Sequence, residues 1–326
     1  MNLFIVGAGF TKAVFPDAPL NRELIPALKR KFQDSSVDHL CMRYGIEDIE
    51  IALTRLDVDL SVLQGRNDPQ ANELRQYRQN IEKSLVSFFA SCPVSEALFS
   101  YSPWLGTLFD SAFVKGDVVV SLNYDCLIEG ILDLRNKWSP NGGYGSLDNP
   151  LAYSGRKIRK SPVAVLKIHG SANFVSAPYV DKPEYESINF EFDEKFFPRS
   201  AKNTHFSFGA GTGKSYIIAP SYVKSPSLDM VYLMLDALRA SRRAKNLVII
   251  GSALRKEDGF LTLLTTNFLR HPAWRDRKII VVDPSARDIT DRIQNFWGVD
   301  VSKQLLPIEG QLEVSVDRLL HAIKLQ

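Results

Sequence analysis

The first apolar run of the chain, Leu3–Val6, leads directly into Gly7, Ala8 and Gly9, with Thr11 close behind. A continuous apolar run predicts a buried strand, and the glycines permit a tight turn into a helix. Free N–H groups at the start of a helix, together with the helix dipole, favour an anion such as a phosphate. The segment therefore predicts an anion site, with a plain strand-to-helix turn as the alternative.

Two further apolar runs also end in polar residues. Asn123 and Asp125 follow Val118–Leu122, and His169 follows Val163–Ile168. An imidazole titrates near neutral pH and can act as a general base. Each residue also has a structural explanation, because Asn and Asp commonly cap helices and a histidine can be buried and hydrogen-bonded. Ligands of open α/β sheets bind at the carboxyl ends of strands, so the three segments together favour one shared site.

The elements that must position these residues read as an α/β protein. Continuous apolar runs alternate with helical patterns; they lie at Leu3–Val6, Val118–Leu122, Val163–Ile168, Tyr216–Ile218, Leu247–Ile250 and Ile279–Val282. This alternation predicts a Rossmann-like parallel sheet covered by helices on both faces. Residues 21–108 read as a helical insertion packed beside the sheet, and residues 173–213 as a smaller, loop-rich insertion. We expect a single catalytic domain over residues 1–326.

Composition narrows the function classes. A net charge of +3 over 326 residues gives no general case for nucleic-acid binding. The three cysteines, Cys41, Cys92 and Cys126, form no Cys-x-x-Cys pair, so we expect neither a disulfide framework nor a metal site. No apolar stretch reaches the roughly 18 residues of a membrane span, which predicts a cytoplasmic protein without membrane contact. Lys12 stands where the dehydrogenase fingerprint has its third glycine, which argues against an ordinary Rossmann dehydrogenase.

Six segments follow one another as GAGFTKAVFPDAPL, SLNYDCLIEG, LKIHGSANF, IIAPSYVKS, LVIIGSALRKEDG and IIVVDPS. In order and spacing they resemble the SIR2 (sirtuin-related) family, in its prokaryotic SIR2-like, NAD⁺-consuming branch. The resemblance extends over most of the chain and leaves out residues 21–108.

The resemblance implies a role for each matching residue, with NAD⁺ as a substrate and no resident cofactor. The residues implied to cradle the pyrophosphate are Gly7, Ala8, Gly9 and Thr11. Asn123 and Asp125 match the Asn-x-Asp that binds the nicotinamide ribose and the nicotinamide end. His169 matches a base that contacts the ribose hydroxyls. The positions implied near the adenosine half are Gly251, Ser252 and Asp283.

The family's deacetylases carry two Cys-x-x-Cys pairs that hold a structural zinc, and this sequence has none. The resemblance thus implies a zinc-less NAD⁺ glycohydrolase (NADase), a hydrolase that releases nicotinamide and ADP-ribose. It further implies a homo-oligomer that serves as effector of a bacterial anti-phage (abortive infection) system, with a partner such as a HerA-like ATPase or an Argonaute-type sensor. The alternatives are a sirtuin-type protein deacylase or ADP-ribosyltransferase, and a non-catalytic NAD-binding oligomerisation module.

Overall fold

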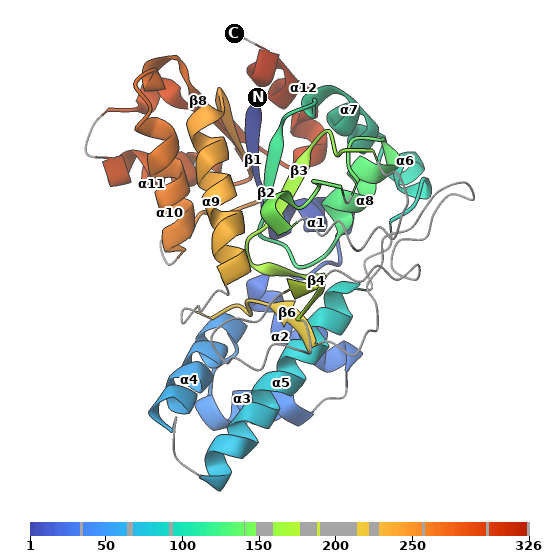
Figure 1. Cartoon of the computed structure of the whole chain (residues 1–326), viewed down its shortest axis with the longest axis vertical. Helices are drawn as coiled ribbons and strands as arrows, with labels where there is room; N and C mark the ends of the chain where they lie inside the picture. The colour runs from blue at the N-terminus through green and yellow to red at the C-terminus, as the bar shows by residue number, and fades with distance from the viewer. Residues whose placement is uncertain are drawn as a thin grey trace.

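A six-stranded parallel sheet forms the centre of the molecule (Figure 1). The computed structural model describes residues 1–32, 35–63, 68–90, 94–139, 141–147, 159–176, 188–189, 214–221, 228–255, 258–297 and 300–324. In sheet order the strands are β3 (Ala164–Lys167), β2 (Val118–Ser121), β1 (Asn2–Val6), β7 (Asn246–Ile250), β8 (Lys278–Asp283) and β9 (Leu305–Glu309). The two central strands, β1 and β7, are buried along their whole length, as continuous apolar runs predict. The predicted Rossmann-like α/β class is confirmed.

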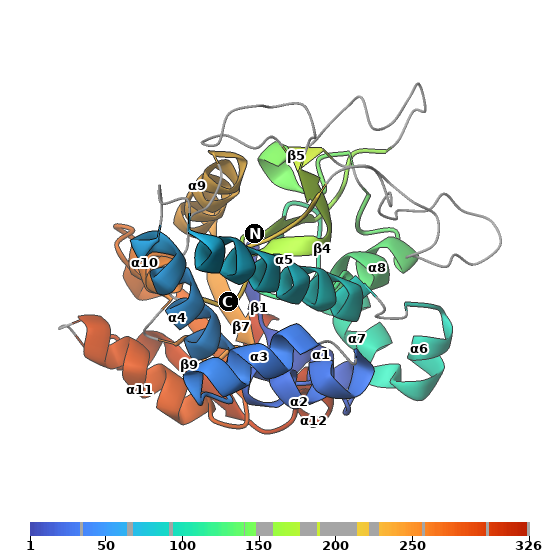
Figure 2. The same ribbon diagram turned by 90° about the horizontal axis from the view of Figure 1, so that it is seen from below.

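Helices cover both faces of this sheet (Figures 1 and 2). One face carries α1 (Ala8–Val14), α7 (Pro103–Ala112), α8 (Leu127–Leu134) and α12 (Leu312–Lys324), with the short α6 (Ala97–Tyr101) beside α7. The other carries α9 (Leu228–Arg243), α10 (Gly259–Leu269) and α11 (Ala286–Trp297). This placement follows from right-handed crossovers, because the chain runs from β1 towards β2 on one side and from β7 towards β8 on the other.

The neighbours β1 and β7 are therefore the point where the strand order reverses. Connections leave their carboxyl ends in opposite directions and to opposite faces, which opens a crevice between them. The segments after Val6 and Ile250 border that crevice.

A second group of elements lies across the carboxyl ends of the parallel strands, in the lower half of Figure 1. Its helices are α2 (Asn21–Lys31), α3 (Ser35–Tyr44), α4 (Ile49–Val62) and α5 (Pro69–Ala90). They enclose a second hydrophobic core, in which Leu28, Leu53 and Ile81 are fully buried. Helix α5 packs on a small antiparallel sheet of order β5-β4-β6, built from β4 (Gly170–Ser176), β5 (Ile188–Asn189) and β6 (Lys214–Ile217).

Three features differ from the sequence-based expectation. The apolar run at Tyr216–Ile218 contributes to β6 of the antiparallel sheet, and not to the parallel sheet. Strand β9 was not predicted, and α5 of the expected helical segment contacts β4 and β6, whereas α7 of the same segment packs in the core of the large sheet. Most of residues 173–213, expected as a loop-rich insertion, lie outside the described residues.

Candidate functional site

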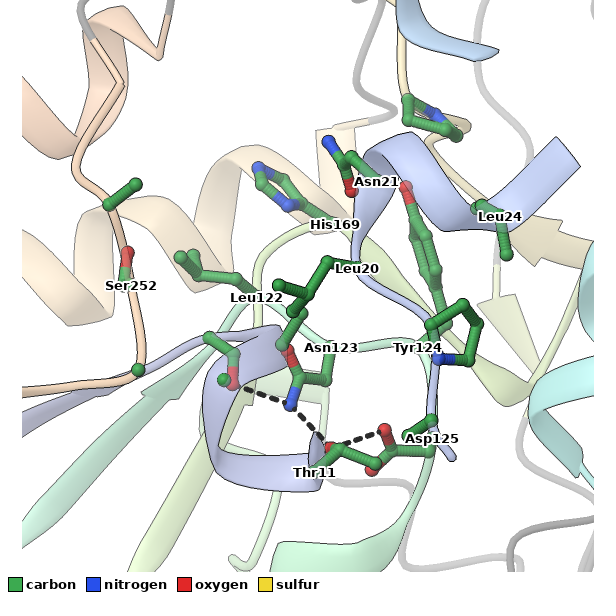
Figure 3. Close-up of a pocket in the computed structure, with 18 of the residues that line it drawn as sticks. Thr11, Leu20, Asn21, Leu24, Leu122, Asn123, Tyr124, Asp125, His169 and Ser252 are labelled. Atoms are coloured by element: carbon green, nitrogen blue, oxygen red, sulfur yellow. Dashed lines mark hydrogen bonds between the residues drawn. The ribbon is translucent and has the colours of Figure 1, made fainter. Parts of the chain in front are cut away.

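A cavity of about 520 Å³ lies at the carboxyl ends of the parallel strands, bordered on its other side by α2, α4 and α5. Its volume is within the range of small-molecule sites. Every residue that the sequence singles out for a site lines it; these are Gly7, Ala8, Gly9, Thr11, Asn123, Asp125, His169, Gly251, Ser252 and Asp283. Figure 3 shows His169 above Asn123 and Thr11, with Ser252 to one side and Leu24 to the other. The structure thus brings together residues from both halves of the sheet.

A chain of hydrogen bonds joins three of these side chains across the floor of the cavity. The Asn123 amide nitrogen donates to the Gly7 carbonyl at 3.1 Å and to the Thr11 hydroxyl oxygen at 2.9 Å (Figure 3). The Thr11 hydroxyl then donates to Asp125 Oδ2 at 2.8 Å, and Asp125 Oδ1 accepts from the Leu127 N–H. The Asp125 carboxylate is therefore occupied by protein donors and holds the Thr11 hydroxyl in one direction.

These bonds fix which way the Asn123 amide faces. A backbone carbonyl can only accept, so the amide nitrogen must point to Gly7, and Oδ1 takes the opposite side of the group. The side chain is 7% exposed and lines the cavity. Asn123 thus presents an oriented carbonyl oxygen there, which can accept from a hydroxyl or water or stabilise positive charge.

The two loops that follow β1 and β7 touch through their backbones. Gly7 N–H donates to the Ile250 carbonyl and Gly9 N–H to the Gly251 carbonyl at 2.9 Å. A Cβ on Gly9 would lie 2.7 Å from the Gly251 Cα, and Gly251 has a φ of +59°. The glycines are needed for this close approach, and their N–H groups are engaged within the protein. The N–H groups of Gly7 and Gly9 are therefore not available to bind an anion, which leaves the anion site predicted for this segment to other groups of the turn.

His169 lies between β3 and β4, and its ring faces Asp258 from the start of α10. The distance from His169 Nε2 to Asp258 Oδ2 is 3.2 Å, and both side chains are 13% exposed. Asp258 also caps α10, because its Oδ1 accepts from the Leu261 N–H. The site therefore contains a histidine paired with a carboxylate that is itself anchored to a helix.

The two remaining predicted polar residues stabilise turns of their own. Ser252 Oγ accepts from the Leu254 N–H, and Leu254 has a positive φ of 42°, which is rare for a branched side chain. Asp283 Oδ1, at the end of β8, accepts from the Ser285 N–H. Both residues line the cavity on the side of β7 and β8.

A buried polar cluster supports the Asn123–Asp125 turn from behind. Lys167 and Glu129 are fully buried, with Nζ and Oε1 3.4 Å apart, and Lys167 Nζ also donates to the Asp125 carbonyl. Burial raises the pKa of Glu129, and it raises the pKa of the neighbouring Cys126 thiol well above its ordinary range. Because a thiolate is the reactive form, this raised pKa disfavours Cys126 as a nucleophile.

Carboxylates dominate the charged lining of the cavity. Among the lining residues that the structure describes, the acids are Asp17, Glu50, Asp125, Asp258 and Asp283, and the one guanidinium is Arg255. Arg255 Nη1 contacts Glu50 Oε2 at 2.5 Å, and the Asn21 amide donates to the same oxygen at 3.2 Å. This ion pair joins the loop after β7 to α4.

The sequence analysis missed Asp258, Glu50 and Arg255. Asp258 could have been predicted as a helix N-cap, because an Asp close before an apolar run is typical of that position. The apolar run of β7 ends shortly before it, which would have placed the cap near the carboxyl end of a strand. Glu50 had no such signal, because it lies in α4, whose position depends on packing against α2, α3 and α5.

Within the ranges that the structure describes, no cluster of three His, Cys, Asp or Glu side chains is placed to hold a metal ion. Cys92 lies outside those ranges. The described helices also include none with the length and apolarity needed to cross a membrane.

No protein-family model matches the chain, and no curated protein sequence does. Among solved structures, the fold is similar to a Sir2 homologue in complex with NAD, with 12% sequence identity and a TM-score of 0.48 over 99% of this chain and 89% of that one. It is also similar to Sir2 bound to an acetylated peptide, with 11% identity and a TM-score of 0.42 over 99% and 92% of the two chains. These likenesses concern the arrangement of the chain alone.

Proposed function

We propose that the protein is an NAD⁺ glycohydrolase, which cleaves NAD⁺ to nicotinamide and ADP-ribose. The proposal joins the SIR2-like motifs of the sequence to one structural observation, which is that all the residues implied to contact NAD⁺ line a single cavity. These residues come from the ends of β1, β2, β3, β7 and β8. NAD⁺ is the substrate in this proposal, and no resident cofactor is invoked.

In the proposed reaction, the bond between the nicotinamide nitrogen and ribose C1′ breaks, and its electron pair leaves with nicotinamide. The positive charge that develops on the sugar is stabilised by oxygens fixed in advance, and the oriented Asn123 Oδ1 is the best placed of these. A water oxygen then bonds to C1′, and its proton passes to the His169 imidazole. Asp125 acts through Thr11 by holding the Asn123 amide in place.

Water is the acceptor in this proposal because the sequence lacks the two Cys-x-x-Cys pairs that the family resemblance links to deacetylases. The cavity also has an apolar side, which is lined by Leu24, Phe88 and Phe89, from α2 and α5, together with Tyr124. Since apolar side chains also suit an acyl chain, a sirtuin-type deacylase is the second candidate.

The test is to incubate the purified protein with NAD⁺ and measure nicotinamide, ADP-ribose and acyl-ADP-ribose, with and without an acylated peptide. Equal amounts of nicotinamide and ADP-ribose without peptide support the hydrolase. Nicotinamide release that requires the peptide, or label transferred to a protein, supports the deacylase or the transferase. NAD⁺ binding with no turnover would leave the non-catalytic module.

We also propose, from the sequence resemblance alone, that the protein is a homo-oligomer and depletes NAD⁺ during phage infection, together with a partner such as a HerA-like ATPase or an Argonaute-type sensor. Light scattering at micromolar concentration tests the first statement, and a monomer at every concentration contradicts it. Cellular NAD⁺ measured after infection, with and without the neighbouring genes, tests the second. An unchanged NAD⁺ level contradicts the proposed role in defence.

A further inference from the structure

The pair formed by His169 and Asp258 goes beyond the roles that the sequence motifs imply. The carboxylate oxygen Oδ2 lies 3.2 Å from Nε2, and both side chains are largely shielded from solvent. Because an ionised carboxylate can only accept a hydrogen bond, a carboxylate at this distance favours the tautomer that carries the proton on Nε2. The lone pair of the neutral ring is then on Nδ1.

Both partners are held by their own backbone contacts. The His169 carbonyl accepts from the Ile218 N–H at 2.8 Å, which ties the residue to the segment after β6. Asp258 Oδ1 accepts from the Leu261 N–H, and Asp258 N–H donates to the Arg255 carbonyl at 3.1 Å. One oxygen of the Asp258 carboxylate thus accepts from the helix, and the other faces the imidazole. The two residues are therefore held by groups that take no part in the reaction.

We propose that Asp258 is a positioning residue that sets the tautomer of His169 and stabilises the imidazolium formed during turnover; this rests on the proposed NAD⁺ hydrolysis. When the attacking water loses its proton, Nδ1 takes it and the ring becomes a cation. Nε2–H stays beside the Asp258 carboxylate, whose negative charge stabilises that cation. Asp258 itself gains no proton.

Other charged side chains share the cavity with His169; they are Asp17, Glu50, Asp125, Arg255 and Asp283. Glu50 is paired with Arg255, and Asp125 with Thr11 and the Leu127 N–H. Of these acids, Asp258 is the one for which the structure gives an ion-pair distance to the ring.

Asp258→Asn is the informative variant, because asparagine is as good a helix cap as aspartate. Its single side-chain oxygen stays with the Leu261 N–H, and an uncharged NH2 group replaces the carboxylate oxygen that faces Nε2. We expect nicotinamide release at neutral pH to fall at least about tenfold, with little change in the melting temperature. Asp48→Asn is the matched control, because Asp48 caps α4 in the same way and does not line the cavity.

A second measurement is independent of turnover. Nitrogen-15 NMR of the imidazole rings, with His169 assigned by comparison with His169→Gln, reports which ring nitrogen carries the proton. The expected result for the wild-type protein is protonated Nε2, and protonated Nδ1 would overturn the inference. So would an Asp258→Asn variant with an unchanged rate of nicotinamide release. Absence of nicotinamide release from the wild-type protein would instead overturn the proposed hydrolysis, while the NMR result would still decide the tautomer.

Discussion

Asn123 is held in the cavity, and it does not cap the helix that follows it. The N-cap of α8 is Cys126, without a side-chain cap bond, and Asp125 is the residue that bonds the Leu127 N–H. Of the two explanations that the sequence leaves open, capping therefore applies to Asp125. The Asn123 amide nitrogen instead donates to the Gly7 carbonyl and the Thr11 hydroxyl.

Replacing Asn123 with alanine tests whether this orientation serves catalysis. We expect nicotinamide release to fall at least about a hundredfold, because an oriented oxygen at the developing charge is lost. Asn267→Ala is the control, since the Asn267 amide also donates to a backbone carbonyl and a hydroxyl, at Leu238 and Ser241, away from the cavity. Asn267→Ala should lower the free energy of unfolding by a similar amount, about 1 kcal/mol per hydrogen bond, and leave the rate of nicotinamide release unchanged.

His169→Ala completes this experiment. Loss of a general base typically costs a factor of about 10² to 10⁴, and the double variant should lose much less than the product of the two single effects. Rates and thermal melts of the three variants decide the point. Normal rates with lowered melting temperatures would mean that both residues serve the scaffold.

Thr11 links Asn123 to Asp125, and its hydroxyl is the testable part of that link. Thr11→Val removes the hydroxyl and leaves a buried carboxylate oxygen and an amide N–H without their partner, at a cost of about 1–3 kcal/mol in unfolding free energy. Thr11→Ser keeps the hydroxyl. We expect turnover to fall in the valine variant and to be largely kept in the serine variant; equal rates in both would show that the hydroxyl does not orient Asn123.

At the scale of elements, the close contact of the loops after β1 and β7 shapes the cavity. A Cβ at Gly251 would lie 2.4 Å from the Phe10 nitrogen and would also require a left-handed backbone. Gly45 has nearly the same φ, +61°, with open space around it. Gly45→Ala should therefore cost about 1–2 kcal/mol of stability from the backbone alone.

Gly251→Ala should lower the free energy of unfolding clearly more than Gly45→Ala does. It should also weaken NAD⁺ binding, because the loops after β1 and β7 must separate. Urea unfolding and calorimetric titration of both variants measure the difference. An equal loss of unfolding free energy in the two variants would show that the loops separate at little cost.

The parallel strands were predictable where burial on both faces makes the run continuously apolar, as in β1 and β7. Strand β9 was not predicted because it is an edge strand in which only Leu305 and Ile308 are buried, with a proline at Pro307. An apolar run predicts a strand but not the strand it pairs with, so β6 was placed in the wrong sheet. Likewise, polar residues at strand ends predicted the sheet side of the cavity, whereas Glu50 depends on tertiary packing that no local pattern encodes.

At the scale of the whole molecule, two hydrophobic cores meet at the cavity, and the Glu50–Arg255 pair spans the gap between them. A double-mutant cycle with Glu50→Gln and Arg255→Gln should give a coupling of about 1 kcal/mol in unfolding free energy, decreasing with salt. The pair Arg287–Glu309 is the control, because both of its side chains are well exposed. Its coupling should be close to zero, and an equal value for the two pairs would contradict a special role for Glu50 and Arg255.

The excess of carboxylates around the cavity has a consequence for how the reaction ends. NAD⁺ carries two phosphate charges and one positive ring, whereas ADP-ribose keeps the phosphates and loses the ring's charge. An acidic lining therefore repels the product more than the substrate, since the interaction scales with the product of the charges. Calorimetric titration of an inactive Asn123→Ala protein should show weaker binding of ADP-ribose than of NAD⁺, with the gap narrowing at high salt. In the proposed hydrolysis, the acidic lining thus favours release of ADP-ribose. Turnover would therefore continue while ADP-ribose accumulates and would stop only when NAD⁺ is exhausted.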